Sequence, residues 1–312
     1  MKTKLIDYVD NGPIFITGHV NPDGDALGSA FALKLFLDSQ NIISDVDFDI
    51  TTKLPSNLNH LPYHLISDDL KEKYNTVFVF DCGNSSRLGK YEEVVLAAEN
   101  VVVIDHHVDP SFGDVQIIDP HAASTTQVLF RQFKDENIEI NEEMANCLLT
   151  GLITDTGRFQ YSNTTSEVFS IAAELLGNGA NLSKISENIY GSIEFNALTL
   201  QSKIIERIVL NEDLQFAHSI VFQNDYKDYK VEPEETDFLI DVVRLVKEST
   251  VALLIKEQED GSFKGSLRSR GDIDVQKIAS IFGGGGHVSA SGFSSNKSPE
   301  FILEKIEHEI RK

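Results

Sequence analysis

The sequence predicts an α/β fold with two domains: an N-terminal, mostly parallel sheet flanked by helices, and a smaller α+β domain, with the active-site cleft between them. Three observations support this prediction. The chain has 312 residues, too many for one typical hydrophobic core. Apolar strand-like runs alternate with amphipathic helical patterns in the N-terminal part, which is the order that produces parallel sheets. After about residue 208 the pattern changes to short strands and helices in mixed order.

The change of pattern also predicts the domain boundaries. We expect the first domain over residues 1–190, a helical linker over 191–208 and the second domain over 209–312. In the first domain the expected strands are Ile14–Thr17, Val77–Phe80, Val101–Ile104 and Val115–Asp119. The expected helices there are Ala26–Leu37, Ala123–Lys134, Asn141 to about Gly151, Thr165–Leu176 and Leu182–Ile189. In the second domain the expected strands are Phe216–Phe222, Val251–Ile255 and Ser262–Leu267. The expected helices there are Thr236–Val246, Val275–Ile281 and Pro299–Ile310.

Composition limits the possible partners. Hydrophobic residues make up 41% and charged residues 24%, as in ordinary soluble domains. The net charge of −22 argues against stable binding of duplex DNA. It does not exclude a small anionic ligand, because bound divalent cations would invert the local sign of the charge.

Other features of the sequence predict a cytoplasmic protein with no membrane partner. Both cysteines, Cys82 and Cys147, lie in apolar settings, which is typical of a reducing compartment. Asp7 and Asp10 precede any apolar stretch at the N-terminus, so we expect no signal peptide. No apolar run is long enough to span a bilayer.

Asp105, His106 and His107 follow the strand Val101–Ile104 directly, at the carboxyl end where open α/β sheets bind their ligands. Two adjacent histidines cannot both point the same way from an extended backbone. One can therefore hold a metal ion while its neighbour faces the substrate. The alternative is a surface histidine pair in a loop, which is the commoner case for an isolated pair.

Further carboxylates and an imidazole recur in similar places. His19, Asp23 and Asp25 lie between a strand and a helix, in a turn that Pro22 and Gly24 would sharpen; the alternative is an ordinary surface turn. Asp81 ends the strand Val77–Phe80, where it could also cap the next helix. Asp155 follows an apolar stretch just as Asp81 does.

Together these residues predict a metal centre. The candidate donors are His19, Asp23, Asp25, Asp81, Asp105, His106, His107 and Asp155. A set rich in carboxylates, with a few imidazoles and no thiolate, suits Mn²⁺ or Mg²⁺ better than a structural zinc. The donors are too many for one ion. Two divalent ions about 3.5–4 Å apart form the usual clamp for phosphoryl displacement.

A second group of residues is suited to binding phosphate. Gly283–Gly286 precede His287, and successive glycines can form a backbone nest for an anion, although a flexible loop is the alternative. Ser124 starts a helix either as its N-cap or as part of a phosphate cradle. The predicted substrate contacts are Arg268, Arg270, Gly284, Gly285, Gly286, His287, Ser124 and Arg158.

The sequence resembles the DHH phosphoesterases. The resemblance rests on residues 19–29, Asp81, Asp105-His106-His107 and Thr154–Gly157, which are similar to the four signature motifs of that family. The Arg268–Arg270 and Gly283–His287 segments are similar to the DHH-associated C-terminal domain. Size and two-domain layout resemble most the bacterial oligoribonucleases that degrade nanoRNA and dephosphorylate 3′-phosphoadenosine 5′-phosphate.

The resemblance implies a role for each residue. It places His19 and Asp23 on one Mn²⁺ ion and Asp25, His106 and Asp155 on a second, with Asp81 bridging them and Mg²⁺ or Co²⁺ as substitutes. Asp105 would orient its neighbours. His107 would contact the scissile phosphate as general acid or electrostatic stabiliser. The implied mechanism is in-line attack on phosphorus by a metal-bridging hydroxide.

The sequence also allows alternative functions. A related DHH hydrolase could act on cyclic dinucleotides, pyrophosphate or polyphosphate, although the Arg-Lys-Lys signature of the pyrophosphatases is missing. A nucleotide-sensing or metal-binding module without catalysis is a different class. The sequence leaves open which substrate is preferred among short single-stranded RNA, dinucleotides and 3′-phosphoadenosine 5′-phosphate. It also leaves open whether the protein forms a homodimer, the polarity of an exonuclease activity, and the roles of Arg87, Phe159 and Tyr161.

Overall fold

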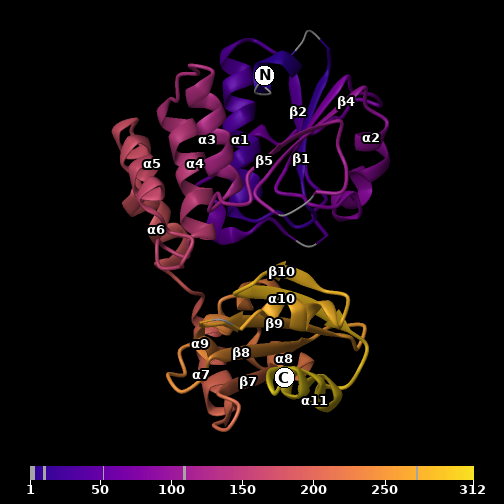
Figure 1. Cartoon of the computed structure of the whole chain (residues 1–312), viewed down its shortest axis with the longest axis vertical. Coiled ribbons are helices and arrows are strands. Elements are labelled where there is room, and N and C mark those ends of the chain that lie inside the picture. The colour runs from indigo at the N-terminus through magenta and orange to yellow at the C-terminus, as the bar shows by residue number, and fades with distance from the viewer. Residues whose placement is uncertain (1–3, 10–11, 52, 108–109, 272) are drawn as a thin grey trace. The chain divides into compact units, whose positions relative to one another are not determined.

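The structure is a computed structural model that describes residues 4–9, 12–51, 53–107, 110–271 and 273–312. It divides into two compact units, Met1–Ser192 and Ile193–Lys312 (Figure 1). Asp10, which argued against a signal peptide, lies outside the described residues. Among the residues that the structure describes, none of the helices combines the length and the apolar character that a bilayer crossing requires.

The first unit is built on a five-stranded sheet in the order β2-β1-β3-β4-β5, in which every neighbouring pair is parallel. The strands are β1 Ile14–Gly18, β2 Ser44–Val46, β3 Thr76–Phe80, β4 Asn100–Asp105 and β5 Val115–Ile118. This confirms the predicted parallel sheet. The short edge strand β2 was not predicted, because a run of only three residues carries little strand signal.

Helices cover both faces of this sheet. The helices of this unit are α1 Gly24–Ser39, α2 Glu92–Leu96, α3 Thr125–Asp135, α4 Glu142–Asp155, α5 Ser166–Gly177 and α6 Leu182–Tyr190. Of these, α5 and α6 pack on α4 and not on the sheet (Figure 1). Short 3₁₀ segments are η1 Leu5–Tyr8, η2 Ser56–Leu58, η3 Tyr63–Leu65 and η4 Ser85–Tyr91. Alternate residues of a strand point to opposite faces, so Phe78 and Phe80 join one apolar cluster while Val77 and Val79 join another. Burial on both faces explains why these strands read as continuous apolar runs.

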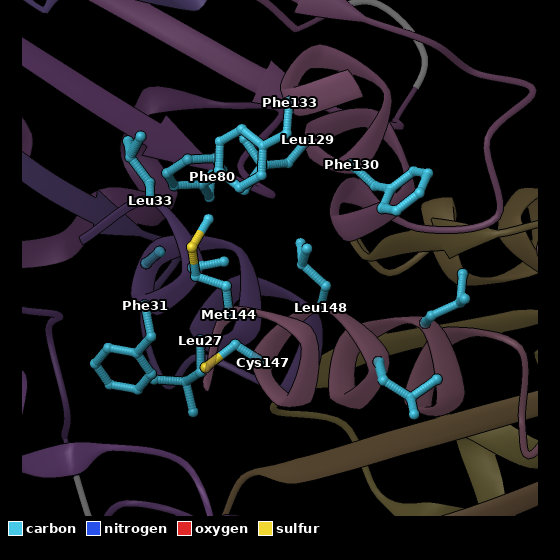
Figure 2. Close-up of a cluster of buried hydrophobic side chains, with 14 of the residues drawn as sticks. Leu27, Phe31, Leu33, Phe80, Leu129, Phe130, Phe133, Met144, Cys147 and Leu148 are labelled. Carbon is cyan, nitrogen blue, oxygen red and sulfur yellow. The ribbon is translucent and has the colours of Figure 1, made fainter. Parts of the chain in front are cut away.

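The larger cluster fixes the helices that carry the site. Figure 2 shows Leu27 and Phe31 of α1, Phe133 of α3 and Leu148 of α4 packed together with Phe80 of the sheet. Helices α1 and α4 approach closely at Gly28, where an added Cβ would lie 2.4 Å from the carbonyl oxygen of Cys147. The separation of these helices is therefore set by the absence of a side chain at that position.

The second unit contains a six-stranded mixed sheet in the order β10-β11-β9-β8-β7-β6. Its strands are β6 Val209–Asn211, β7 Phe216–Val221, β8 Val251–Glu257, β9 Phe263–Ser269, β10 Gly285–His287 and β11 Ala290–Ser295. Its helices are α7 Phe195–Glu206, α8 Gln223–Tyr229, η5 Pro233–Thr236, α9 Leu239–Arg244, α10 Val275–Ser280 and α11 Pro299–Ile310. Separate apolar clusters cover the two faces of the sheet. The mixed order of strands and helices is the α+β arrangement expected from the sequence.

The second unit differs locally from the expected elements. The helix predicted over residues 236–246 is shorter in the structure, where α9 spans Leu239–Arg244 and the 3₁₀ segment η5 ends at Thr236. Within the expected connector 191–208, α7 buries Ala197, Leu200 and Ile204 in the core of the second unit. Gly285 and Gly286 lie in β10, not in an open loop, because their backbone pairs with β11.

Candidate metal centre

The register of the sheet brings three of the predicted residues into one row. Gly18 pairs with Phe80, and Phe80 pairs with Ile104, so the last residues of β1 and β3 lie beside the next-to-last residue of β4. The next residue along each chain segment is His19, Asp81 and Asp105, respectively. Parallel strands therefore place an imidazole and two carboxylates side by side at one edge of the sheet.

Two helices add the remaining carboxylates to this edge. Asp23 is the N-cap of α1, where its Oδ1 accepts hydrogen bonds from Asp25 N at 3.0 Å and Ala26 N at 3.1 Å. Asp25 lies in the first turn of the same helix. Asp155 is the last residue of α4, so the apolar stretch that precedes it is helical, whereas the one before Asp81 is the strand β3. The apolar residues before it are the buried face of a helix, which a short run cannot distinguish from a strand.

The first donor group consists of His19, Asp23 and Asp81, whose ligand atoms lie within 4.8 Å of one another. His19 Nε2 lies 3.8 Å from Asp23 Oδ2 and 3.5 Å from Asp81 Oδ2. His19 Nδ1 lies 2.9 Å from the carbonyl oxygen of Val20, which orients the ring with Nε2 towards the carboxylates.

The second donor group consists of Asp25, His106 and Asp155. His106 Nε2 lies 3.2 Å from Asp155 Oδ2 and 4.0 Å from Asp25 Oδ2. The other ring nitrogen, Nδ1, lies 3.3 Å from the carbonyl oxygen of Ala122. Both groups thus contain an imidazole whose Nδ1 faces a backbone carbonyl and whose Nε2 faces carboxylates.

Asp81 lies between the two groups. Its Oδ2 faces His19 Nε2 at 3.5 Å, and its Oδ1 faces His106 Nε2 at 3.7 Å. Asp81 adopts a φ of 55°, an uncommon left-handed conformation for a residue with a side chain. The carboxylate therefore presents one oxygen to each donor group.

Sequence reasoning missed the residues that hold the carboxylates of Asp25 and Asp81. The backbone N–H groups of Thr125 and Thr126, at the start of α3, donate to Asp25 at 2.6 and 2.9 Å. Thr125 Oγ1 also donates to Asp81 Oδ1 at 3.2 Å. The start of α3 was predicted as a possible phosphate cradle; in the structure these N–H groups serve a carboxylate of the protein itself.

Asp105 anchors the two histidines that follow it. Its Oδ1 accepts hydrogen bonds from His106 N at 2.7 Å and His107 N at 3.0 Å, and lies 2.7 Å from His107 Nδ1. The His107 side chain remains 25% exposed, whereas the Asp105 side chain is fully buried. His107 Nδ1 also lies 3.4 Å from Asp81 Oδ1.

Burial and mutual repulsion shift the pKa values of the carboxyl groups. Burial raises the pKa of Asp25 well above its usual range, and repulsion from Asp155 and Asp81 adds to this. Burial likewise raises the pKa of Asp155 to about 6, against the effect of His106. Burial also acts on Asp81, but hydrogen bonds from His107 and His19 outweigh it and hold its pKa well below the usual range.

The imidazoles balance this negative charge. Burial alone would lower the pKa of His106, but Asp155, Asp25 and Asp81 raise it to about 11. Burial is similarly outweighed by neighbouring carboxylates at His19 and His107, whose pKa values rise to about 10. The cluster thus gains stability from positive charge among its carboxylates, which a bound cation would also supply.

The spacing of the donors fits divalent cations. Ligands about 2.1 Å from an octahedral ion lie roughly 3.0 Å apart when adjacent and 4.2 Å apart when opposite. The separations between imidazole nitrogen and carboxylate oxygen in the two groups run from 3.2 to 4.0 Å. Oxygen and nitrogen donors without a thiolate match Mn²⁺ or Mg²⁺ in kind. The residues present therefore fit a metal centre.

Ser124 has a structural position. It is fully buried, and its Oγ accepts a hydrogen bond from Gln127 N at 3.1 Å as the N-cap of α3. Of the two interpretations left open by the sequence, the structure therefore shows the N-cap.

Arg158 is exposed after α4, with its guanidinium 4.0 Å from the centre of the Tyr190 ring. The ring of Phe159 packs at 5.5 Å from that of Phe169, and the ring of Tyr161 lies against Gly157, which has a φ of 53°. Phe159 and Tyr161 therefore have packing contacts.

The second unit carries the other predicted substrate contacts. Ala290 of β11 pairs with both His287 and Arg268, so these three residues lie in one row of the sheet. Arg270 follows β9, and its guanidinium donates to the carbonyl oxygens of Arg244, at the end of α9, and of Val246. An added Cβ at Gly284 would lie 2.2 Å from the carbonyl oxygen of Gly292, so close strand packing also requires a glycine here.

Comparison with known proteins gives consistent matches along most of the chain. Residues 13–152 match the model of the DHH family, N-terminal domain, and residues 213–312 match that of the DHHA1 domain. A protein of Thermus thermophilus named bifunctional oligoribonuclease and PAP phosphatase NrnA is 32% identical, covering 96% of this chain and 90% of its own. A Streptococcus mutans protein named as a probable enzyme of the same kind is 28% identical, covering 94% and 93%. The crystal structure of an exopolyphosphatase-related protein from Bacteroides fragilis is 26% identical, with a TM-score of 0.90 over 98% of this chain and 94% of that one.

Proposed function

The chain belongs to the DHH family of phosphoesterases, and from this premise we propose that it hydrolyses short RNA oligonucleotides and 3′-phosphoadenosine 5′-phosphate with two bound Mn²⁺ ions. The relatives named as bifunctional oligoribonucleases and PAP phosphatases, which align over nearly the whole chain, support the substrate class. The net charge of −22 agrees with a small substrate, because a long nucleic acid needs an extended basic surface.

The observation that carries the two-ion proposal is the placement of Asp81 between the donor groups. One oxygen of its carboxylate faces His19 at 3.5 Å and the other faces His106 at 3.7 Å. His19 and Asp23 would hold one ion, Asp25, His106 and Asp155 would hold the other, and Asp81 would contribute to both sites. Mg²⁺ or Co²⁺ would substitute for Mn²⁺, since the donor set suits each of these ions.

The bound cations would supply a water of lowered pKa and stabilise the charge that develops on the phosphoryl oxygens. The protein's own residues position the substrate and handle the proton. Asp105 holds His107 through the 2.7 Å contact to Nδ1, which leaves Nε2 as the ring nitrogen directed away from Asp105. His107 would then donate a proton, or a hydrogen bond, to the leaving oxygen.

We further propose that the second unit recognises the non-reacting part of the substrate. Arg268, Gly284, Gly285, Gly286 and His287 belong to neighbouring strands of one sheet or the residues beside them. Arg158 is the exposed candidate in the first unit. Arg270 would contribute only if its hydrogen bonds to backbone carbonyls were exchanged for phosphate contacts.

We also propose that the protein is cytoplasmic. Cys82 and Cys147 are free and buried, which supports this proposal because disulfides are rare in that compartment.

Replacing Asp81 with Asn tests the assignment directly. The wild-type protein should convert a dinucleotide and 3′-phosphoadenosine 5′-phosphate in the presence of Mn²⁺, and Asp81→Asn should lose at least about 100-fold in turnover, as when a group that stabilises a transition state is removed. Asp45→Asn is the control, because Asp45 contacts Lys71 and Tyr74 and none of the donors. Undiminished turnover by Asp81→Asn would refute the two-ion proposal.

One observation favours a second candidate function. The structural relative from Bacteroides fragilis is described as exopolyphosphatase-related and superimposes over nearly the whole chain. A phosphoanhydride could bind at the same metal centre, because its phosphoryl groups are anionic in the same way as those of a phosphoester. Polyphosphate, pyrophosphate, a cyclic dinucleotide and a linear dinucleotide should be compared side by side at equal Mn²⁺. Faster conversion of a phosphoanhydride would favour the second function.

A further inference from the structure

The loop between β1 and α1 carries His19 and Asp23, and its backbone is held by two carbonyl groups from distant segments. Val20 N donates to the carbonyl oxygen of Arg87 at 2.7 Å, and Asn21 N donates to that of Asp49 at 2.9 Å. Asn21 has a φ of 50°, a left-handed conformation that asparagine adopts more readily than most residues. The shape of the loop therefore depends on where these two carbonyls lie.

Asp49 has hydrogen bonds to both the loop and the segment that carries the second carbonyl. Its own carbonyl binds Asn21, while its carboxylate Oδ2 accepts a hydrogen bond from Lys90 N at 2.9 Å. Lys90 lies in η4, the same segment that supplies the carbonyl of Arg87. An added Cβ at Gly89 would lie 1.9 Å from Asp49 Oδ2, so the carboxylate sits directly against the backbone of η4.

We propose that Asp49 is a positioning residue for the donor group His19, Asp23 and Asp81, an inference that rests on the proposed function because it presupposes that this group binds a metal ion. Asp49 links the loop that follows β1 to the segment that follows Asp81. It acts through backbone hydrogen bonds, and the carboxylate serves as a hydrogen-bond acceptor.

The role of the acceptor can be separated from the role of the charge. Asp49→Ala removes the acceptor, whereas Asp49→Asn removes the charge but keeps a side-chain oxygen that can bind Lys90 N. Asp45→Asn is the matched control, because it removes one charge from the same segment but from a carboxylate that binds Lys71 and Tyr74. Mn²⁺ binding to each full-length protein is measured by isothermal titration calorimetry, after thermal unfolding in EDTA has shown that each variant folds.

Asp49→Ala should weaken one of the two Mn²⁺ sites by about 10-fold, which is a typical effect of losing a residue that orients metal ligands. Asp49→Asn and Asp45→Asn should bind Mn²⁺ within about twofold of the wild type on the same reasoning. If Asp49→Ala does not fold, Asp49→Ser replaces it, because the shorter side chain does not reach Lys90 N.

Two results would overturn the inference: wild-type affinity in Asp49→Ala, or an equal loss in Asp49→Ala and Asp49→Asn, which would indicate an effect of charge. Failure of the proposed function is distinguishable, because the wild-type protein itself would then bind no Mn²⁺.

Discussion

Thr125 donates a hydrogen bond from its side-chain hydroxyl to Asp81 Oδ1 at 3.2 Å, which joins the first residue of α3 to the carboxylate at the end of β3. Both residues are buried, and the backbone N–H of Thr125 also binds Asp25. One residue thus contacts a carboxylate from each of two elements of the candidate metal centre.

Thr125→Val should weaken metal binding without unfolding the protein. Valine has nearly the same shape but no hydroxyl, so Asp81 loses an orienting hydrogen bond while the backbone N–H to Asp25 remains. We expect Mn²⁺ affinity to fall by about 10-fold. Thr126→Val is the control, because its hydroxyl contacts Ser124 at 2.7 Å and its backbone N–H still reaches Asp25. Calorimetric titration with Mn²⁺ measures both, and equal affinities would contradict the role of Thr125.

Mn²⁺ affinity should rise with pH. Neighbouring carboxylates outweigh burial and raise the pKa of His19 to about 10 and that of His106 to about 11. Since a metal ion must displace these protons from its ligands, binding is opposed at pH below these values and opposed less as pH increases. Titrations at pH 6.5 and 8.5 in buffers of different ionisation enthalpy should show tighter binding at the higher pH and proton release at both. The same affinity at both pH values, without proton release, would count against imidazole ligation.

Gly28→Ala should destabilise the first unit. The new Cβ would lie 2.4 Å from the carbonyl oxygen of Cys147, so α1 and α4 would be forced apart. We expect the free energy of unfolding to fall by about 1–3 kcal/mol, the usual cost of overpacking. At Gly177, the last residue of α5, an added Cβ meets nothing within 4 Å. Gly177→Ala should therefore be neutral or stabilise by up to about 1 kcal/mol in urea denaturation. Equal stability of the two variants would show that the helices can separate freely.

The ion pair between Arg207 and Asp225 should make stability depend on acid pH. Burial tends to raise the pKa of Asp225, but hydrogen bonds from Arg207 at 2.6 and 2.9 Å outweigh it and lower the pKa below its usual value. A carboxyl group whose pKa is lower in the folded state stabilises fully above its unfolded pKa, and this stabilisation is lost as pH falls through the folded pKa.

Asp225→Asn should therefore lower the free energy of unfolding by about 1–3 kcal/mol at pH 7. The difference from wild type should shrink as the pH falls below about 4, the usual pKa of an aspartate, because the wild-type carboxyl group then also becomes protonated. Urea denaturation of both proteins at pH 7 and pH 3 provides the measurement. Asp228→Asn, an exposed position on the same helix, is the control for the loss of one negative charge. A difference that grows as the pH falls would contradict the sign of this prediction.

Much of the fold could be predicted from local patterns. Buried parallel strands read as apolar runs, and the polar residue that ends each run marks the edge where ligands bind. For that reason the three apolar runs and the polar residue after each were enough to predict that His19, Asp81 and Asp105 lie together. The edge strand β2 and the extended glycines of β10 carry weak local signals, and their conformation depends on the strand beside them.

By itself, the sequence determined the parallel sheet, the kinds of donor at its edge and the resemblance to the DHH phosphoesterases, because side-chain periodicity and short motifs are local properties. Only the tertiary structure decided that Asp155 ends a helix, that α3 binds Asp25 from 100 residues away, and that Asp49 holds the loop of His19. Hydrogen bonds to backbone groups leave no recognisable pattern of residue types in the sequence. Every residue has a backbone carbonyl, and every residue except proline has a backbone N–H. Packing of the helices on the sheet brings these groups together.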